Sequence, residues 1–309
     1  MTARERTMPG RNLFSFGQGI QASSGTWYKN LQLLGTGGNA ETYLVVATSG
    51  NFKGVPFAMK AFTKVWQEER RKSFLDEVAF LKGCNHPSIM RVYDDGVFAE
   101  EHPFLVAEYL PNTLERVIRA DNSTTTEKVS FTLQLLSALA YLATLAPPII
   151  HRDIKPRNIF VKGRSCVLGD FGLLKREGVA GDEGDREAFK ESIGVGMPFR
   201  YRTPDLIAYL NDGVPPTTKS DVFQLGLVVA ELFTGWNPLK RSQKVSDPVV
   251  LDELGNISGA LSAGIANLIS RMLILSPEQR EPASKFIDPW QGVFLDSAKR
   301  AHGLEGRVF

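Results

Sequence analysis

The stretch HRDIKPRN, residues 151–158, decides the fold, and GDFG follows it at residues 169–172. Asp153, Asn158 and Asp170 bring two carboxylates and one amide into this short part of the chain. Such oxygens are the ligands that Mg²⁺ prefers, and a carboxylate also accepts protons. Each Asp alone is equally well explained as a turn or helix-capping residue. Turn chemistry does not predict the whole set at these spacings, so we interpret the stretch as catalytic.

Further towards the N-terminus, a glycine-rich run and a lysine lie in a β-rich region. The run GTGG, residues 35–38, separates two predicted strands, where glycine lets backbone N–H groups approach an anion. Taken alone, the run is better explained as a tight hairpin without a ligand. Lys60 lies in an apolar strand and needs a partner, and Glu77, on a helix predicted over residues 64–83, is the candidate. A surface ion pair is the alternative for these two residues.

Together with TPD at residues 203–205, these motifs resemble the catalytic domain of protein kinases in their order and spacing, over residues 27–287. The resemblance implies that Asp153 is the catalytic carboxylate, which orients the acceptor hydroxyl and accepts its proton. It implies that Lys155, in the IKP setting typical of Ser/Thr-directed kinases, contacts the transferred phosphoryl group.

The same resemblance implies ATP and Mg²⁺, or Mn²⁺ in its place, as cofactors. Asn158 and Asp170 are the implied metal ligands, and Glu77 is implied to orient Lys60 toward the nucleotide phosphates. The implied nucleotide-binding residues are Gly35, Thr36, Gly37, Gly38, Ala40, Thr42, Ala58, Lys60, Glu108, Leu110 and Phe160.

The glycine-rich run departs from the family pattern at three positions. Ala40 replaces a usual glycine, Asn39 an aromatic residue and Thr42 a valine. Ala40 remains small, whereas a polar Asn39 at the tip of the loop shields phosphates less well. We therefore expect weaker nucleotide affinity without its loss.

Three residues outside the motifs are implied to support them. Asp221 resembles the buried Asp that braces the catalytic loop, although a simple helix N-cap is an alternative. Arg280 resembles the buried arginine that pairs with an acid, here Asp205. For His151 we expect a structural role in the loop.

The expected fold is α+β, the bilobal protein-kinase fold with a β-rich N-lobe containing one helix and a mainly α-helical C-lobe. The predicted organisation is a flexible tail over residues 1–26, the N-lobe over 27–108, the C-lobe over 109–290 and a C-terminal extension over 291–309.

Composition limits the other possibilities. A formal charge of +2 and 43% hydrophobic residues indicate a globular protein with no electrostatic reason for a nucleic-acid partner. Two cysteines, Cys84 and Cys166, and four scattered histidines support neither a disulfide framework nor a zinc site. The longest apolar segment is too short to cross a membrane, so we expect a cytoplasmic location with no membrane partner.

The resulting hypothesis is a protein serine/threonine kinase that acts on a protein substrate, resembles stand-alone bacterial kinases and is regulated by autophosphorylation. Ser192 is the Ser/Thr-type hydroxyl between Phe171 and Tyr201, and its phosphate is expected to pair with Arg152. A scaffold without activity and a small-molecule phosphotransferase are the alternatives. The sequence decides neither the substrate nor the oligomeric state.

Overall fold

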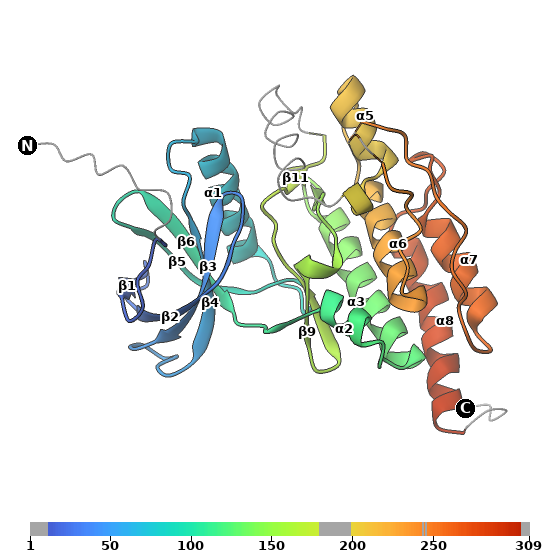
Figure 1. The fold of residues 1–309 in the computed structure, drawn as a ribbon, viewed down its shortest axis with the longest axis horizontal. Coiled ribbons are helices and arrows are strands. Elements are labelled where there is room, and N and C mark those ends of the chain that lie inside the picture. The colour runs from blue at the N-terminus through green and yellow to red at the C-terminus, as the bar shows by residue number, and fades with distance from the viewer. Residues whose placement is uncertain (1–11, 179–198, 243, 245, 304–309) are drawn as a thin grey trace, which may run out of the picture. The chain divides into compact units, whose positions relative to one another are not determined.

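The computed structural model describes residues 12–178, 199–242, 244 and 246–303. These residues form two compact units (Figure 1). The first consists of the described residues up to 83 together with 91–109. The second consists of residues 84–90 and the described residues from 110 onward.

The first unit is built on a six-stranded antiparallel sheet with the strand order β1-β2-β3-β4-β6-β5. Its elements are β1 (Gly19–Gln21), β2 (Trp27–Thr36), β3 (Ala40–Ala47), β4 (Pro56–Phe62), α1 (Glu68–Gly83), β5 (Val92–Phe98) and β6 (His102–Glu108). This confirms the expected β-rich region with one helix, which begins at residue 68 rather than 64.

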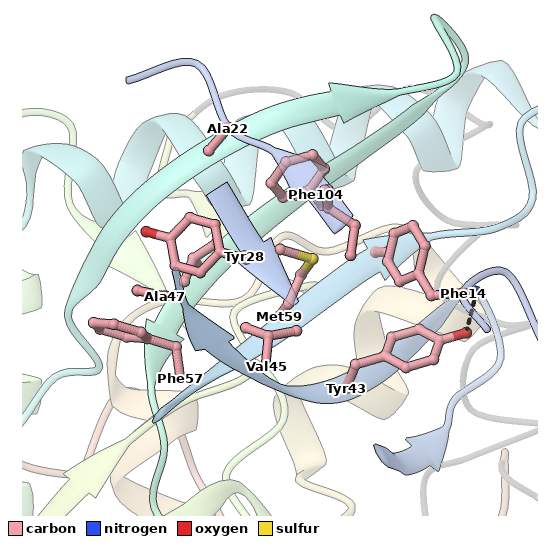
Figure 2. Close-up of a cluster of buried hydrophobic side chains, with 12 residues drawn as sticks. Phe14, Ala22, Tyr28, Tyr43, Val45, Ala47, Phe57, Met59 and Phe104 are labelled. Atoms are coloured by element: carbon pink, nitrogen blue, oxygen red, sulfur yellow. Dashed lines mark hydrogen bonds between the residues drawn. The ribbon is translucent and has the colours of Figure 1, made fainter. Parts of the chain in front are cut away.

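Alternate residues of β3 and β4 are buried on one face of this sheet, as the period of a strand requires. These side chains form one cluster with buried residues of other segments (Figure 2). The cluster includes Phe14, Tyr28, Tyr43, Val45, Ala47, Phe57, Met59 and Phe104. The intervening residues lie on the opposite face. Among them, Thr42 lies directly opposite Lys60 in the β3–β4 register.

The segment before β2 differs from the predicted flexible tail. Residues 1–11 lie outside the described part of the chain, but from residue 12 the segment is folded onto the sheet. Phe14 is 2% exposed, and β1 pairs with β2 so that Gly19 lies opposite Lys29. The expectation of a flexible tail was wrong here because the contacts that order the segment come from residues of distant strands.

The second unit is mainly helical, as expected. The central helix α6 has 12 buried residues among its 16 and packs against α3 and α7, while α8 packs along α3 (Figure 1). The helices are α2 (Leu114–Ala120), α3 (Thr125–Thr144), α5 (Pro204–Asp212), α6 (Lys219–Thr234), α7 (Ser262–Met272) and α8 (Ser284–Ala301), with 3-10 turns η1 (Pro156–Asn158) and η2 (Phe199–Tyr201). In the described part of the chain, no helix is both long and apolar enough to span a bilayer.

Five short strands form two small sheets in the second unit. They are β7 (Asn112–Thr113), β8 (Ile149–Ile150), β9 (Ile159–Lys162), β10 (Ser165–Leu168) and β11 (Lys175–Arg176). One sheet has the order β10-β9-β7, and the other pairs β11 with β8. The residues of the HRDIKPRN and GDFG motifs lie at the ends of these strands.

The predicted boundary at residue 290 falls inside a helix. α8 continues from Ser284 to Ala301, and the side chain of Trp290 is fully buried. A separate extension is therefore not seen at residues 291–301, because the buried face of α8 belongs to the core of the second unit.

Candidate active site

Asp153 lies in the loop between β8 and η1 of the second unit. Its Oδ2 accepts hydrogen bonds from Lys155 Nζ and Asn158 Nδ2, both at 2.8 Å. Its Oδ1 is buried and has no hydrogen-bond partner among the described residues. A carboxylate oxygen in this state can accept a hydrogen bond from an incoming hydroxyl.

The surroundings of Asp153 set its protonation. Burial raises the pKa of Asp153 to about 6, the positive charge of Lys155 opposes this, and the negative charge of Asp170 adds to it. The hydrogen bonds from Lys155 and Asn158 also lower the pKa. A pKa of about 6 still leaves the carboxylate mainly ionised at neutral pH, so that it acts as an acceptor.

Two side chains of α6 hold the backbone of this loop. Asp221 accepts the backbone N–H groups of His151 at 2.7 Å and Arg152 at 2.9 Å, which confirms the predicted bracing. Gln224 accepts the N–H of Ile154 at 2.9 Å and donates to the carbonyl of Arg152 at 3.1 Å. Arg152 has a φ of +67°, a strained value that these contacts stabilise. Sequence reasoning missed Gln224, which lies one helical turn after Asp221.

His151 connects the catalytic loop to the GDFG motif. Its Nδ1 accepts the N–H of Asp153 at 3.2 Å, so Nε2 carries the proton and donates to the carbonyl of Gly169 at 3.1 Å. A Cβ on Gly169 would lie 2.9 Å from the ring of Phe160, which explains the glycine. These contacts confirm the structural role expected for His151.

Asn158 and Asp170 offer two oxygen ligands for a cation. Asn158 uses its Nδ2 to bond both the carbonyl and the carboxylate of Asp153, and its Oδ1 accepts no hydrogen bond from the described residues. Asp170 is exposed, and the N–H of the preceding Gly169 donates to the carbonyl of Asn158 at 2.9 Å. The described residues contain no group of three or more His, Cys, Asp or Glu that would hold a metal without further ligands. This donor set fits Mg²⁺, which binds few carboxylates and takes its other ligands from water and phosphate.

Lys60 and Glu77 form a buried ion pair in the first unit. Lys60 Nζ lies 2.9 Å from both carboxylate oxygens of Glu77, whose side chain is only 2% exposed. α1 buries Glu77 on the same face as Phe74 and Val78. This confirms the predicted pairing and excludes the alternative of a surface ion pair.

The glycine-rich run forms the turn between β2 and β3. Gly37 donates its N–H to the carbonyl of Ala40 at 2.8 Å, and Gly35 lies opposite Thr42 in the register. A Cβ on Gly35 would meet no atom within 4 Å, so internal packing does not require glycine at this position. The backbone at residue 35 is therefore open to a ligand.

Asn39 is held more firmly than expected of a polar residue at the tip of the turn. Its Oδ1 accepts a hydrogen bond from Arg70 of α1, and its carbonyl accepts the N–H of Thr63 at 2.9 Å. These contacts tie the turn to the helix that carries Glu77. Sequence reasoning missed them because Arg70 lies 31 positions along the chain.

The remaining predicted nucleotide-binding residues lie in both units. Ala58 of β4 and Glu108 at the end of β6 belong to the first unit, and Leu110 and Phe160 belong to the second. The combined role of these residues in nucleotide binding stays a prediction.

Comparison with known proteins identifies the family of the chain. A sequence profile of the protein kinase domain matches residues 28–290. The chain belongs to the protein kinase family. Its β-rich unit with one helix and its mainly helical unit are the N-lobe and C-lobe of that fold.

Individual protein kinases share only about a third of their residues or fewer with this chain over the matched regions. Ephrin type-A receptor 8 of Mus musculus is 31% identical over 72% of this chain, and a probable serine/threonine-protein kinase of Dictyostelium discoideum is 30% identical over 83%. Ephrin type-B receptor 1 of Gallus gallus is 26% identical over 66%. The matches span only 21%, 15% and 20% of the lengths of these relatives.

Proposed function

We propose that this kinase transfers the γ-phosphoryl group of ATP to Ser or Thr hydroxyls of protein substrates. The observation that carries the proposal is the buried Oδ1 of Asp153, which has no hydrogen-bond partner in the described part of the chain and lies next to Lys155. The acceptor hydroxyl donates a hydrogen bond to Oδ1 and passes its proton to the carboxylate as its oxygen bonds to phosphorus and ADP leaves. Lys155, already 2.8 Å from Asp153, balances the charge of the transferred group.

The other groups of the proposed site bind and orient the nucleotide. Glu77 directs Lys60 toward the α- and β-phosphates, and the open backbone of the glycine-rich turn covers the phosphates. Mg²⁺ held by Asn158 and Asp170 would neutralise negative charge on the phosphates. A scaffold without activity is less well supported, because such a protein has no chemical need for this complete set.

The choice of Ser or Thr rests on Lys155 within the IKP sequence, since the relatives include both ephrin receptors and a probable serine/threonine-protein kinase. The test is incubation with labelled ATP, Mg²⁺ and three peptides that differ only in having Ser, Thr or Tyr as the acceptor. We expect label on the Ser and Thr peptides. Transfer to Tyr alone would contradict the proposed specificity.

We also propose autophosphorylation as the regulatory step. Ser192 lies outside the described residues, whereas its expected partner Arg152 is described in the loop next to Asp153. The same incubation without peptide should label the protein at Ser192, and Ser192→Ala should lower activity. An unlabelled wild-type protein with full activity would exclude this switch.

Replacement of Glu77 by Gln should lower kcat/KM roughly 10- to 100-fold, because Lys60 then loses the charge that orients it. Glu69→Gln, on the exposed side of the same helix, is the matched control and should leave kcat/KM unchanged. Steady-state kinetics with varied ATP measures both. Equal kinetics for the two variants would show that the ion pair has no part in catalysis.

A further inference from the structure

The segment comprising residues 12–26 is an addition to the matched kinase domain, which begins at residue 28. We call this segment the N-terminal clasp. It belongs to the first unit and contacts three strands of the sheet, β2, β3 and β5. Its contacts with β3 lie close to the glycine-rich turn.

One end of the clasp joins the two edges of the kinase sheet. β1 pairs with β2, and Ser23 donates its N–H to the carbonyl of Asp95 on β5 at 2.7 Å. Ser24 Oγ donates to the carboxylate of Asp94 at 2.5 Å, and Tyr28 of β2 donates to the same oxygen at 3.2 Å. The clasp therefore connects β2 and β5, which would be the two edge strands of the sheet without β1.

The other end is anchored by Phe14. Its ring faces that of Tyr43 (Figure 2). The ring centroids of Phe14 and Tyr43 are 4.8 Å apart, those of Phe14 and Phe98 are 4.9 Å apart, and Phe14 is 2% exposed. Asn30 Nδ2 donates to the carbonyl of Phe14 at 3.2 Å. Phe16, two residues further on, is 83% exposed, so the anchor is specific to one aromatic side chain.

A chain of hydrogen bonds runs from this anchor to the stem of the turn. The N–H of Phe14 donates to the hydroxyl of Tyr43 at 3.1 Å, and that hydroxyl donates to the carboxylate of Glu41. The N–H of Leu13 donates to the same oxygen of Glu41 at 2.8 Å. Burial, together with Glu41, raises the pKa of Tyr43, which keeps its hydroxyl protonated as a donor.

Glu41 links the clasp to the glycine-rich turn. It lies opposite Thr36, the last residue of β2, and directly follows Ala40, whose carbonyl accepts the N–H of Gly37. The two residues that flank the turn, Thr36 and Ala40, are therefore both next to Glu41 in the sheet. If the contacts of Glu41 already order the turn, the turn loses less conformational entropy when it binds a ligand. Nucleotide binding is then stronger.

We propose that the clasp, acting through Glu41, is a positioning element that orders the glycine-rich turn for nucleotide binding. The inference rests on the proposed binding of nucleotide by that turn. Loss of the anchor should weaken nucleotide binding and leave the phosphoryl-transfer step unchanged, because that step is assigned to Asp153 and Lys155, whereas the hydrogen bonds of the clasp are made to residues of the first unit.

Phe14→Ala and Phe16→Ala in the full chain form the main comparison. We expect Phe14→Ala to raise the Kd of a fluorescent ATP analogue and the KM for ATP roughly tenfold with kcat kept, and Phe16→Ala to match the wild type. Hydrogen exchange at residues 36–40 without nucleotide should be faster in Phe14→Ala. An unchanged Kd and unchanged exchange in a folded Phe14→Ala protein would overturn the proposal.

Two substitutions of Glu41 separate positioning from stability. Glu41→Gln keeps an oxygen that accepts from Leu13 and Tyr43, so its Kd should remain near that of the wild type, whereas Glu41→Leu should show the tenfold rise. A lower Tm with an unchanged Kd in Glu41→Leu would show that the clasp only stabilises the fold. These binding and exchange readouts do not depend on transfer to Ser or Thr, so a wrong acceptor assignment leaves them interpretable.

Discussion

Asp153→Asn should lower kcat at least roughly 10³-fold while the protein stays folded and binds nucleotide. Oδ2 of Asp153 receives two donors, Lys155 Nζ and Asn158 Nδ2. An Asn at this position must therefore turn its single oxygen toward those donors. Its amide NH₂ then occupies the place of Oδ1, and a donor replaces the acceptor that the substrate hydroxyl needs.

The measurement is single-turnover transfer of label from ATP, which isolates the chemical step from product release. Asp296→Asn, at an exposed position of α8, makes the same chemical change away from the site and should keep full activity. Retention of more than about a tenth of kcat in Asp153→Asn would contradict the role assigned to Asp153.

The contacts among Asp153, Lys155 and Asn158 are local, since the three residues lie within six positions of one another. The backbone of their loop is held from α6 by Asp221 and Gln224, and of these two residues the sequence indicated only Asp221. The pairs Lys60–Glu77 and Asp205–Arg280 were predicted over much longer separations, and the contacts confirm both. There the family resemblance supplied what local patterns do not contain.

The clasp could not be predicted for the opposite reason. The sequence does not show which of Phe14 and Phe16 is buried, and the three-residue strand around Ile20 has too few positions to show alternation. Its order comes from Asn30, Glu41 and Tyr43, which belong to other strands. The contact between Asn39 and Arg70 was missed because neither residue has a local pattern that points to the other.

Arg280→Met should lower the free energy of unfolding by about 3 to 5 kcal/mol. The Arg280 side chain is fully buried, and its Nη1 lies 2.9 Å from Oδ2 of Asp205. It also donates to three carbonyls, those of Lys219, Ile274 and Leu275, and packs over the ring of Phe223. Removing it leaves a buried carboxylate without its counter-ion and three carbonyls without this donor.

Urea unfolding followed by the circular dichroism of the helices measures this loss, because most helices belong to the C-lobe. Arg271→Met is the matched control. Its ion pair with Glu281 is shorter, at 2.6 Å, but the two side chains are 33% and 37% exposed, so we expect a loss below about 1 kcal/mol. Equal losses in the two variants would show that burial does not set the strength of the Arg280 pair.

The double variant Asp205→Leu with Arg280→Met identifies which part of the loss is electrostatic. Asp205 Oδ1 already has no partner among the described residues, so without Arg280 the whole buried carboxylate is uncompensated. Replacing it by Leu removes that charge, and the double variant should be more stable than Arg280→Met alone by about 1 to 3 kcal/mol. The part that is not recovered belongs to the three carbonyls and to the packing over Phe223, because both variants lack the Arg280 side chain. A double variant less stable than Arg280→Met would mean that Asp205 stabilises the C-lobe through contacts other than this ion pair.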